Sequence, residues 1–296
     1  MIAIDHARQE QIEHGRLEAL TAFPRTWKDI VSTWRCDDSG DAAWLVYTAN
    51  YLFRCGNVRW ALDPMTLPHR LNHSNLPDLA ADLQGLDFIL LSHKHSDHFN
   101  PQIIRDLRYL PARWVVPADL MPMVAVPDGL AQDQLVVPRS LEAIEIEGIR
   151  ITPFASLHWE ASCANDRSHP TDGLRGVPET GYLVEHNSKR WLFPGDIRCF
   201  DPNGLPDFGP VDVLFAHVWL GRGAASPPED SILDKFCQFY LAFRPRRIIL
   251  AHLRDWGRQA PDFWGIEHAS AILTKFQERA PDILVEIALM GDKIVL

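Results

Sequence analysis

The chain of 296 residues has an ordinary globular composition, with 46% hydrophobic and 23% charged residues, which is enough apolar material for a substantial core. Its formal charge of -10 repels polyanions at long range and disfavours binding to nucleic acid. No run approaches the roughly 20 apolar residues of a membrane span, and the N-terminus lacks the pattern of a secretory signal. Five cysteines without CxxC spacing favour reduced thiols, so we expect a cytoplasmic protein.

Residues 1–40 are expected to form a polar, helical arm in front of a domain over 41–296. The apolar side chains of this arm follow Pro24 at the spacing of one helix face: Trp27, Ile30, Val31 and Trp34. We expect this helix to dock on the domain. The alternatives are a contact between the subunits of a homo-oligomer and a lid over a pocket.

From about residue 43 the pattern changes to strands, first in hairpins and later interleaved with helices. The expected strands are 44–54 with 58–62, 88–91, 144–146 with 149–151, 182–184 with 190–193, 211–215 and 248–250, and a last hairpin turns at Gly291-Asp292. The expected helices begin at Pro101, behind the cap Asn100, and cover 228–243 and 265–278. This order indicates a layered α/β sandwich.

Four of the apolar, strand-like runs each lead into a residue that can bind a metal ion. These residues are His93, His158, Asp196 and His252. Because neighbouring strands deliver their ends to a common edge of a sheet, residues far apart in sequence can converge there. Imidazole and carboxylate donors together suit zinc, iron or manganese.

The stretch HKHSDH at 93–98 places three imidazoles and a carboxylate in one tight loop. Residues two apart, His93 and His95, can face one ion, while Asp97 and His98 can face a second. A lone histidine is more often a core or surface residue, but the position of His158 at the end of a strand favours a ligand. The same holds for His252. The pattern therefore predicts a metal site.

These motifs make the sequence resemble the metallo-β-lactamase-fold hydrolases from about Ala43 to the C-terminus. The matching stretches are DP at 63–64, SHKHSDH at 92–98, LHW at 157–159, PGD at 194–196 and AHL at 251–253. The resemblance implies a four-layer αββα sandwich with two divalent metal ions, zinc being expected and manganese or iron being alternatives. It implies that the first ion is bound by His93, His95 and His158. It implies that the second is bound by Asp97, His98 and His252, that Asp196 bridges the two, and that Asp63 supports the site.

Within this superfamily the ligand set is similar to that of the lactonase-like group, which includes ascorbate-6-phosphate lactonase, and to that of N-acyl-phosphatidylethanolamine phospholipase D. Two departures stand out. Ile197 lies where many relatives carry threonine, and His217 lies where relatives often carry proline. The substrate pocket is therefore expected to differ from theirs.

The chemistry of such a site follows from general principles. Two cations roughly 3.5–4 Å apart lower the pKa of a shared water from about 15.7 towards 7, so hydroxide exists at neutral pH. Asp97 is expected to orient this hydroxide while it serves as a ligand. His217 is the candidate for the general acid or the oxyanion donor, and a histidine of the pocket wall is the alternative.

Three further residues are candidates for contact with the substrate. Arg198 and Arg254 each follow a predicted ligand by two residues, where a guanidinium could pair with an anionic group; ordinary exposed arginines are the alternative. Trp159 is expected to line the pocket, or else to fill the core. A loop over the site is expected at 160–178.

Together the residues predict a dinuclear metal-dependent hydrolase that uses a metal-bridged hydroxide on a small ester-type molecule. The substrate class is left open between a phosphodiester and a lactone, with an anionic group on the molecule. One alternative is an RNA- or DNA-processing nuclease of the same fold, which the net charge disfavours. Another is an iron-containing redox protein, because histidine and aspartate sites accept iron. A third is a non-catalytic binding module, which the complete ligand set disfavours.

Overall fold

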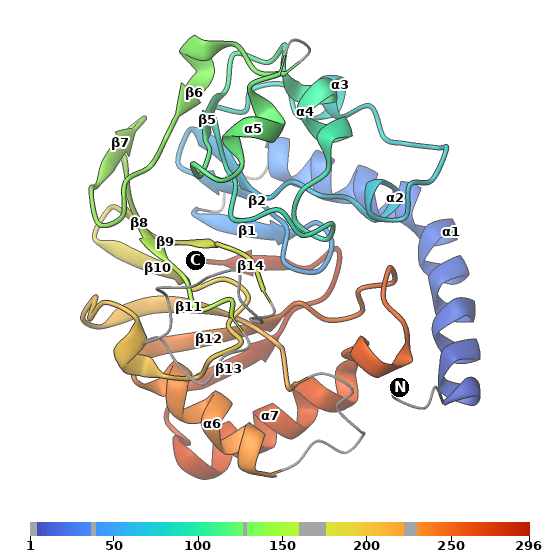
Figure 1. Ribbon diagram of the computed structural model, residues 1–296, viewed down its shortest axis with the longest axis vertical. Coiled ribbons are helices and arrows are strands. Elements are labelled where there is room, and N and C mark those ends of the chain that lie inside the picture. Colours follow the sequence, from blue (N-terminus) through green and yellow to red (C-terminus); the bar gives the residue numbers. More distant parts are fainter. Residues whose placement is uncertain (1–4, 37–39, 127–128, 160–175, 222–229) are drawn as a thin grey trace. The chain divides into compact units, whose positions relative to one another are not determined.

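The structure is a computed structural model that describes residues 5–36, 40–126, 129–159, 176–221 and 230–296. The chain folds into two compact units, each with a seven-stranded sheet (Figure 1). The N-terminal unit comprises Ala3–Pro138, Asp255–Ala260 and Leu289–Leu296, and the C-terminal unit comprises mainly Arg139–Arg254 and Pro261–Ala288. The loop expected at 160–178 lies for the most part outside the described residues.

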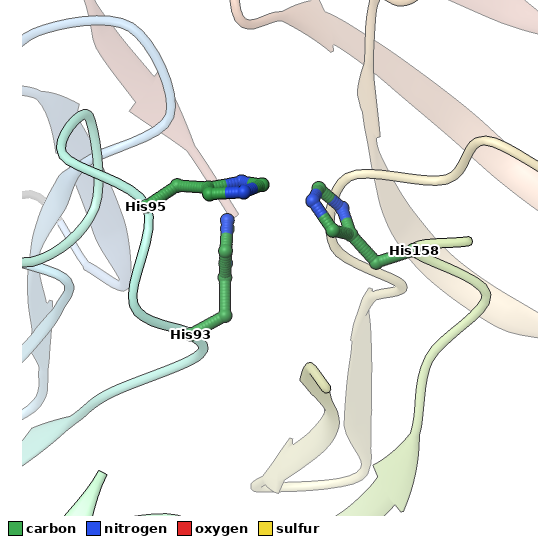
Figure 2. Close-up of side chains that lie close together, drawn as sticks. All are labelled: His93, His95 and His158. Carbon is green, nitrogen blue, oxygen red and sulfur yellow. The ribbon is translucent and has the colours of Figure 1, made fainter. Parts of the chain in front are cut away.

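The sheet of the N-terminal unit is mixed, with the strand order β14-β1-β2-β3-β4-β5-β6. Its strands are β1 (Ala42–Leu45), β2 (Tyr51–Cys55), β3 (Val58–Leu62), β4 (Phe88–Leu90), β5 (Arg113–Val115), β6 (Leu135–Val136) and β14 (Lys293–Val295). The pairs from β14 to β3 are antiparallel, and those from β3 to β6 are parallel. Leu62 pairs with Leu90, so β3 and β4 end side by side. The chain then enters the loop that carries His93 and His95 (Figure 2).

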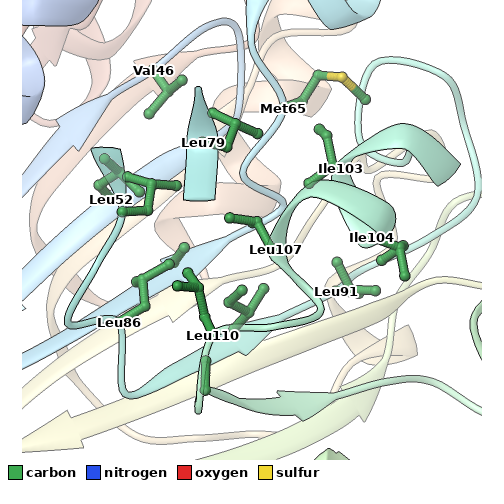
Figure 3. Close-up of a cluster of buried hydrophobic side chains, with 14 of the residues drawn as sticks. Val46, Leu52, Met65, Leu79, Leu86, Leu91, Ile103, Ile104, Leu107 and Leu110 are labelled. Atoms are coloured by element: carbon green, nitrogen blue, oxygen red, sulfur yellow. The ribbon is translucent and has the colours of Figure 1, made fainter. Parts of the chain in front are cut away.

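The helices of this unit pack around a single hydrophobic core, of which Figure 3 shows a part. They are α1 (His6–Cys36), α2 (Leu67–Arg70), α3 (Leu79–Asp82), α4 (Pro101–Leu107) and α5 (Met121–Val124), with a 3-10 turn at Gln132–Gln134. Helix α4 begins as the sequence predicts. The side chain of Asn100 accepts a hydrogen bond from the Gln102 backbone N–H (2.8 Å), and Pro101 takes the first helical position.

Helix α1 is longer than the sequence predicts. Pro24 lies inside one helix of 31 residues instead of starting a shorter one. Proline removes one backbone donor, but burial of apolar side chains on both sides of it, at Ile12 and Trp27, keeps the helix continuous. The predicted apolar face is buried in the core of the same unit, as docking requires. That face is therefore not exposed for an oligomer contact.

The C-terminal unit repeats the same strand pattern in the order β13-β12-β11-β10-β9-β8-β7. Its strands are β7 (Ile144–Ile146), β8 (Ile149–Ala155), β9 (Thr180–His186), β10 (Lys189–Phe193), β11 (Val211–His217), β12 (Pro245–Ala251) and β13 (Leu284–Ile287). The pairs from β7 to β10 are antiparallel, and those from β10 to β13 are parallel. Helices α6 (Asp230–Leu241) and α7 (Ile266–Arg279) pack against each other, and a 3-10 turn lies at Pro202–Gly204. A further 3-10 turn, Ala260–Asp262, begins with the last residue of the segment Asp255–Ala260 of the N-terminal unit.

The three hairpins predicted before residue 195 are present, but the strand expected at 44–54 is divided into β1 and β2, and only β2 forms the hairpin with β3. The last predicted hairpin is wrong. Strands β13 and β14 belong to different sheets, where β13 runs parallel to β12 and β14 runs antiparallel to β1. The Gly291 N–H donates to the Leu45 carbonyl (2.8 Å), and the Leu45 N–H donates to the Asp292 carbonyl (2.9 Å). The turn is thus bonded to β1, so the final strand pairs there and not with the strand before it.

Candidate metal centre

The loop that follows β4 alternates between buried and exposed side chains. His93, Asp97 and His98 are buried, while Lys94 and Ser96 are exposed. The ring of His95 meets that of His93 edge-on, with centroids 4.9 Å apart (Figure 2). His93 and His95 each offer a ring nitrogen, and these two atoms lie within 4.8 Å of each other. A carboxylate oxygen of Asp97 and a ring nitrogen of His98 also lie within 4.8 Å of each other. The members of each pair predicted from the spacing therefore lie close together within this loop.

Asp63 supports this loop from the end of β3. Its Oδ1 accepts a hydrogen bond from the Ser92 backbone N–H (2.8 Å), and its Oδ2 lies 2.8 Å from His98 Nδ1. The Ser92 hydroxyl donates to the same Oδ2, so the hydroxyl oxygen can accept from His93 Nδ1, which is 2.9 Å away. A carboxylate acceptor places the proton of a neutral imidazole on Nδ1, which leaves Nε2 with the lone pair that a metal requires.

Asn50 is a buried residue that the sequence analysis missed. Its side-chain amide donates to the backbone carbonyl of Asp63 (2.9 Å) and to that of Asp97 (2.9 Å). Its Oδ1 accepts from the Thr48 backbone N–H (3.2 Å). One amide thus ties the supporting residue to a predicted ligand. No motif marks this asparagine, because any buried donor with two acceptors in reach would serve.

In the C-terminal unit, three predicted site residues meet at the ends of parallel strands. Asp196 follows β10, His217 ends β11, and His252 follows β12. His217 Nδ1 lies 2.8 Å from Asp196 Oδ1, and His252 Nε2 lies 3.5 Å from Asp196 Oδ2. The two imidazole rings are stacked with centroids 5.6 Å apart. Of the four strand-end residues predicted to converge, Asp196 and His252 thus lie close together within this unit.

His158 joins the same group from the end of β8. Its Nδ1 lies 2.6 Å from the backbone carbonyl of Asp196. Glu179, which the sequence analysis missed, accepts from the Asp196 backbone N–H with both carboxylate oxygens (3.0 Å each). Its Oε2 is also 3.5 Å from His158 Nδ1. Glu179 thus supports two predicted ligands at once.

Gly195 is required for this arrangement. Its φ is +88°, and a Cβ added there would lie 2.5 Å from the carboxyl group of Glu179. Any side chain would therefore push Glu179 off the Asp196 backbone N–H. Position 195 of the PGD motif therefore requires glycine because the buried side chain of Glu179 occupies the space of a Cβ.

Tyr240, a buried residue of helix α6, contacts this group at His217. Its hydroxyl donates to the His217 carbonyl (3.4 Å). Burial raises the pKa of Tyr240 well above its ordinary value, and the carboxylates of Asp196 and Glu179 add to this effect. The hydroxyl is therefore a neutral donor at physiological pH.

The three residues predicted to contact the substrate have different surroundings. The guanidinium of the half-buried Arg198 lies over the Trp219 ring, 5.9 Å from its centroid. Arg254 is exposed and has a φ of +54°. Trp159 is half-buried and forms a β-bridge with Gly176. Their role in substrate binding stays a prediction.

The donor chemistry fits divalent metal ions of borderline hardness. The predicted ligands are imidazoles and carboxylates, without a thiolate. Three of the histidines, in loops of both units, have Nδ1 within 2.9 Å of an oxygen acceptor of their own unit: His93, His98 and His158. Such outer contacts fix the tautomer and orient the ring of a metal ligand.

Two sheets of this strand pattern, with histidine and aspartate side chains at the strand ends, define the metallo-β-lactamase fold. The family model described as the β-lactamase superfamily domain matches residues 61–253. A UPF0173 metal-dependent hydrolase of Listeria monocytogenes serotype 4a is 30% identical over 166 residues, which are 54% of this chain and 67% of that protein. The chain belongs to the β-lactamase superfamily and, within it, to the UPF0173 family of metal-dependent hydrolases.

Solved structures agree with this fold. Igni18, a metallo hydrolase from Ignicoccus hospitalis, has a TM-score of 0.59 at 14% identity, covering 86% of this chain and 97% of its own. CmlA, a diiron β-hydroxylase from Streptomyces venezuelae, has a TM-score of 0.58 at 16% identity over 87% of this chain. This chain spans about half of the CmlA chain, with 54% covered. The predicted fold is confirmed. Among the described helices, none is long and apolar enough to cross a membrane.

Proposed function

We propose that this metal-dependent hydrolase binds two divalent metal ions and cleaves a small ester-type molecule, a phosphodiester or a lactone. The observation that carries the proposal is the orientation of the histidines in both units. Nδ1 of His98 faces the Asp63 carboxylate at 2.8 Å, and Nδ1 of His158 faces a backbone carbonyl at 2.6 Å. Both contacts leave Nε2 as the coordinating nitrogen.

The proposed ligands are those that the sequence motifs imply. The first ion would be held by His93, His95 and His158, the second by Asp97, His98 and His252, and Asp196 would bind both. Zinc is the metal that we expect first, with manganese or iron as alternatives. When bound, such a pair supplies hydroxide at neutral pH and stabilises charge on the leaving oxygen.

The chain's own residues would orient the reactants and move the proton. Asp97 would accept a hydrogen bond from the attacking hydroxide. The ring of His217 is held by Asp196, with 2.8 Å between Nδ1 and Oδ1, and we propose that it donates to the leaving oxygen or to the oxyanion. Arg198, Arg254 and Trp159 would bind the anionic part of the substrate.

The test combines metal analysis with a substrate panel. Purified wild-type protein should contain close to two equivalents of metal by elemental analysis and should hydrolyse chromogenic phosphodiesters or lactones. Less than one equivalent together with no turnover would exclude the proposal. His98→Ala should lose metal, whereas His14→Ala, at a histidine whose side chain is 75% exposed on α1, should keep it. Single-stranded RNA in the same assay tests the nuclease alternative, and the iron content tests the redox alternative.

A further inference from the structure

We infer that Arg258 positions the predicted metal-binding carboxylate of Asp97, and that helix α1 holds Arg258 in place. The inference rests on the proposed two-metal hydrolase and concerns the residues that support one of its proposed ligands. Both Arg258 and α1 lie outside residues 61–253, which match the family model. This support is therefore a feature of the chain beyond the matched region.

One guanidinium bridges two buried carboxylates. Arg258 Nη2 donates to Asp97 Oδ2 (2.6 Å), and Arg258 Nε donates to Asp255 Oδ2 (2.8 Å). The side chains of Asp97 and Asp255 are each only 3% exposed. The planar fork of arginine fixes the direction of both contacts. The contact with Arg258 at Oδ2 therefore sets the direction of a carboxylate that we propose as a metal ligand.

Asp255 is itself anchored on its other side. Arg70 donates to both of its oxygens, from Nε to Oδ1 and from Nη2 to Oδ2, at 2.9 Å each. The Tyr47 hydroxyl donates to Oδ1 (2.9 Å), and burial together with the Asp255 carboxylate raises the pKa of Tyr47, so it stays a neutral donor. Arg70 Nη1 also donates to the Ser96 hydroxyl (2.9 Å), next to Asp97 in the loop. Arg70 and Arg258 thus both bind Asp255, and each also contacts the loop directly, Arg70 at Ser96 and Arg258 at Asp97.

The first half of α1 holds the segment that carries Arg258. Arg16 donates to the backbone carbonyls of Trp256 (2.6 Å) and Arg258 (3.4 Å). The Gln9 side chain accepts from the Ala260 N–H (2.9 Å). A Cβ added at Gly15 would lie 2.6 Å from the Trp256 ring, so the helix backbone packs directly on the indole. Residues 9–16 of α1 therefore fix the backbone on both sides of Arg258.

The physical consequence concerns the affinity for metal at Asp97. Without Arg258 the buried carboxylate loses the donor that sets its direction. Outer contacts of this kind typically change metal affinity by roughly 10- to 100-fold. The ligands that would hold the first ion do not include Asp97, so binding of that ion should be preserved.

The experiment is a metal titration of the metal-free full-length protein, with Zn²⁺ competed by a chromophoric chelator and Co²⁺ followed by its absorption bands. We expect the second equivalent to bind roughly 10- to 100-fold more weakly in Arg258→Ala, and the first equivalent to be unchanged. Arg258→Lys should give an intermediate affinity because lysine lacks the fork, and Arg16→Ala a smaller loss in the same direction. Arg25→Ala is the matched control, an arginine of α1 whose side chain is 92% exposed.

The outcomes separate this inference from the function on which it rests. A wild-type protein that binds no metal would refute both the positioning role of Arg258 and the proposed two-metal hydrolase. A wild-type protein with two equivalents, and Arg258 variants with unchanged affinity for both, would overturn the positioning role while the hydrolase stands. Lower thermal stability with unchanged affinities would show a purely structural ion pair. If Arg258→Ala does not fold, Arg258→Lys and Arg16→Ala decide by the same titration.

Discussion

The carboxylate of Asp63 fixes the tautomer of His98, and an asparagine at this position should reverse it. In Asp63→Asn one carboxylate oxygen becomes an NH₂ group of nearly the same size. The Ser92 backbone N–H, 2.8 Å from Asp63 Oδ1, can only donate, so the amide oxygen should stay there. The new NH₂ then faces His98 Nδ1 at the position of Oδ2, now 2.8 Å away. The imidazole can accept this donor only by moving its proton to Nε2.

The magnitude follows from the hydrogen bonds. The Ser92 hydroxyl, which donates to Asp63 Oδ2 in the wild type, must turn to His93 Nδ1, so that His93 also moves its proton to Nε2. With both tautomers switched, every donor near residue 63 keeps an acceptor, so the metal-free protein should lose only about 1 kcal/mol of unfolding free energy. To bind metal through Nε2, His98 must return the proton to Nδ1, where it would face the NH₂ group. An unsatisfied buried donor costs about 1–3 kcal/mol, which corresponds to a loss of roughly 5- to 150-fold in metal affinity.

Two measurements check this reasoning. Long-range ¹H–¹⁵N NMR of the histidine side chains reports which nitrogen carries the proton, and urea denaturation with chelator-competed metal titration reports stability and affinity. Asp133→Asn is the control, at an exposed aspartate of the same unit. If Asp63→Asn kept the Nδ1–H tautomer of His98 and bound metal as the wild type does, the role assigned to Asp63 would be refuted.

Three other predictions concern both units. Gly195→Ala should lower the unfolding free energy by about 1–3 kcal/mol in urea denaturation, since φ is +88° and a Cβ would meet Glu179; an unchanged midpoint would contradict this. His217→Ala should lower kcat with metal content intact, and an unchanged kcat would remove the proposed proton donor. Burial lowers the pKa of His69 below 6.5, against the opposing effect of Asp106. The unfolded chain then binds the proton more tightly, so stability should fall as pH drops below about 6.5, and His69→Gln should flatten that slope in Tm measurements at pH 5 and pH 8.

The fold and the candidate ligands could be predicted from the patterns and motifs of the residues. The strand periods located the three early hairpins, and the apolar spacing after Pro101 located α4. A metal site in the loop 93–98 could be predicted from the residue sequence because metal binding requires particular side chains at particular spacings. Alternation along a tight loop is local, so the inward direction of His93 and Asp97 needed no knowledge of the rest of the chain.

The residues that support those candidate ligands could be identified only in the folded chain. Arg258 contacts Asp97 across 161 residues, and Asn50 reaches it across 47. The final strand joined β1 for the same reason, since its partner lies at the other end of the chain. A metal ligand must be one of a few residue types, so it is visible in the sequence. A supporting hydrogen bond can come from many residue types at any distance along the chain, and only folding selects which one is in reach.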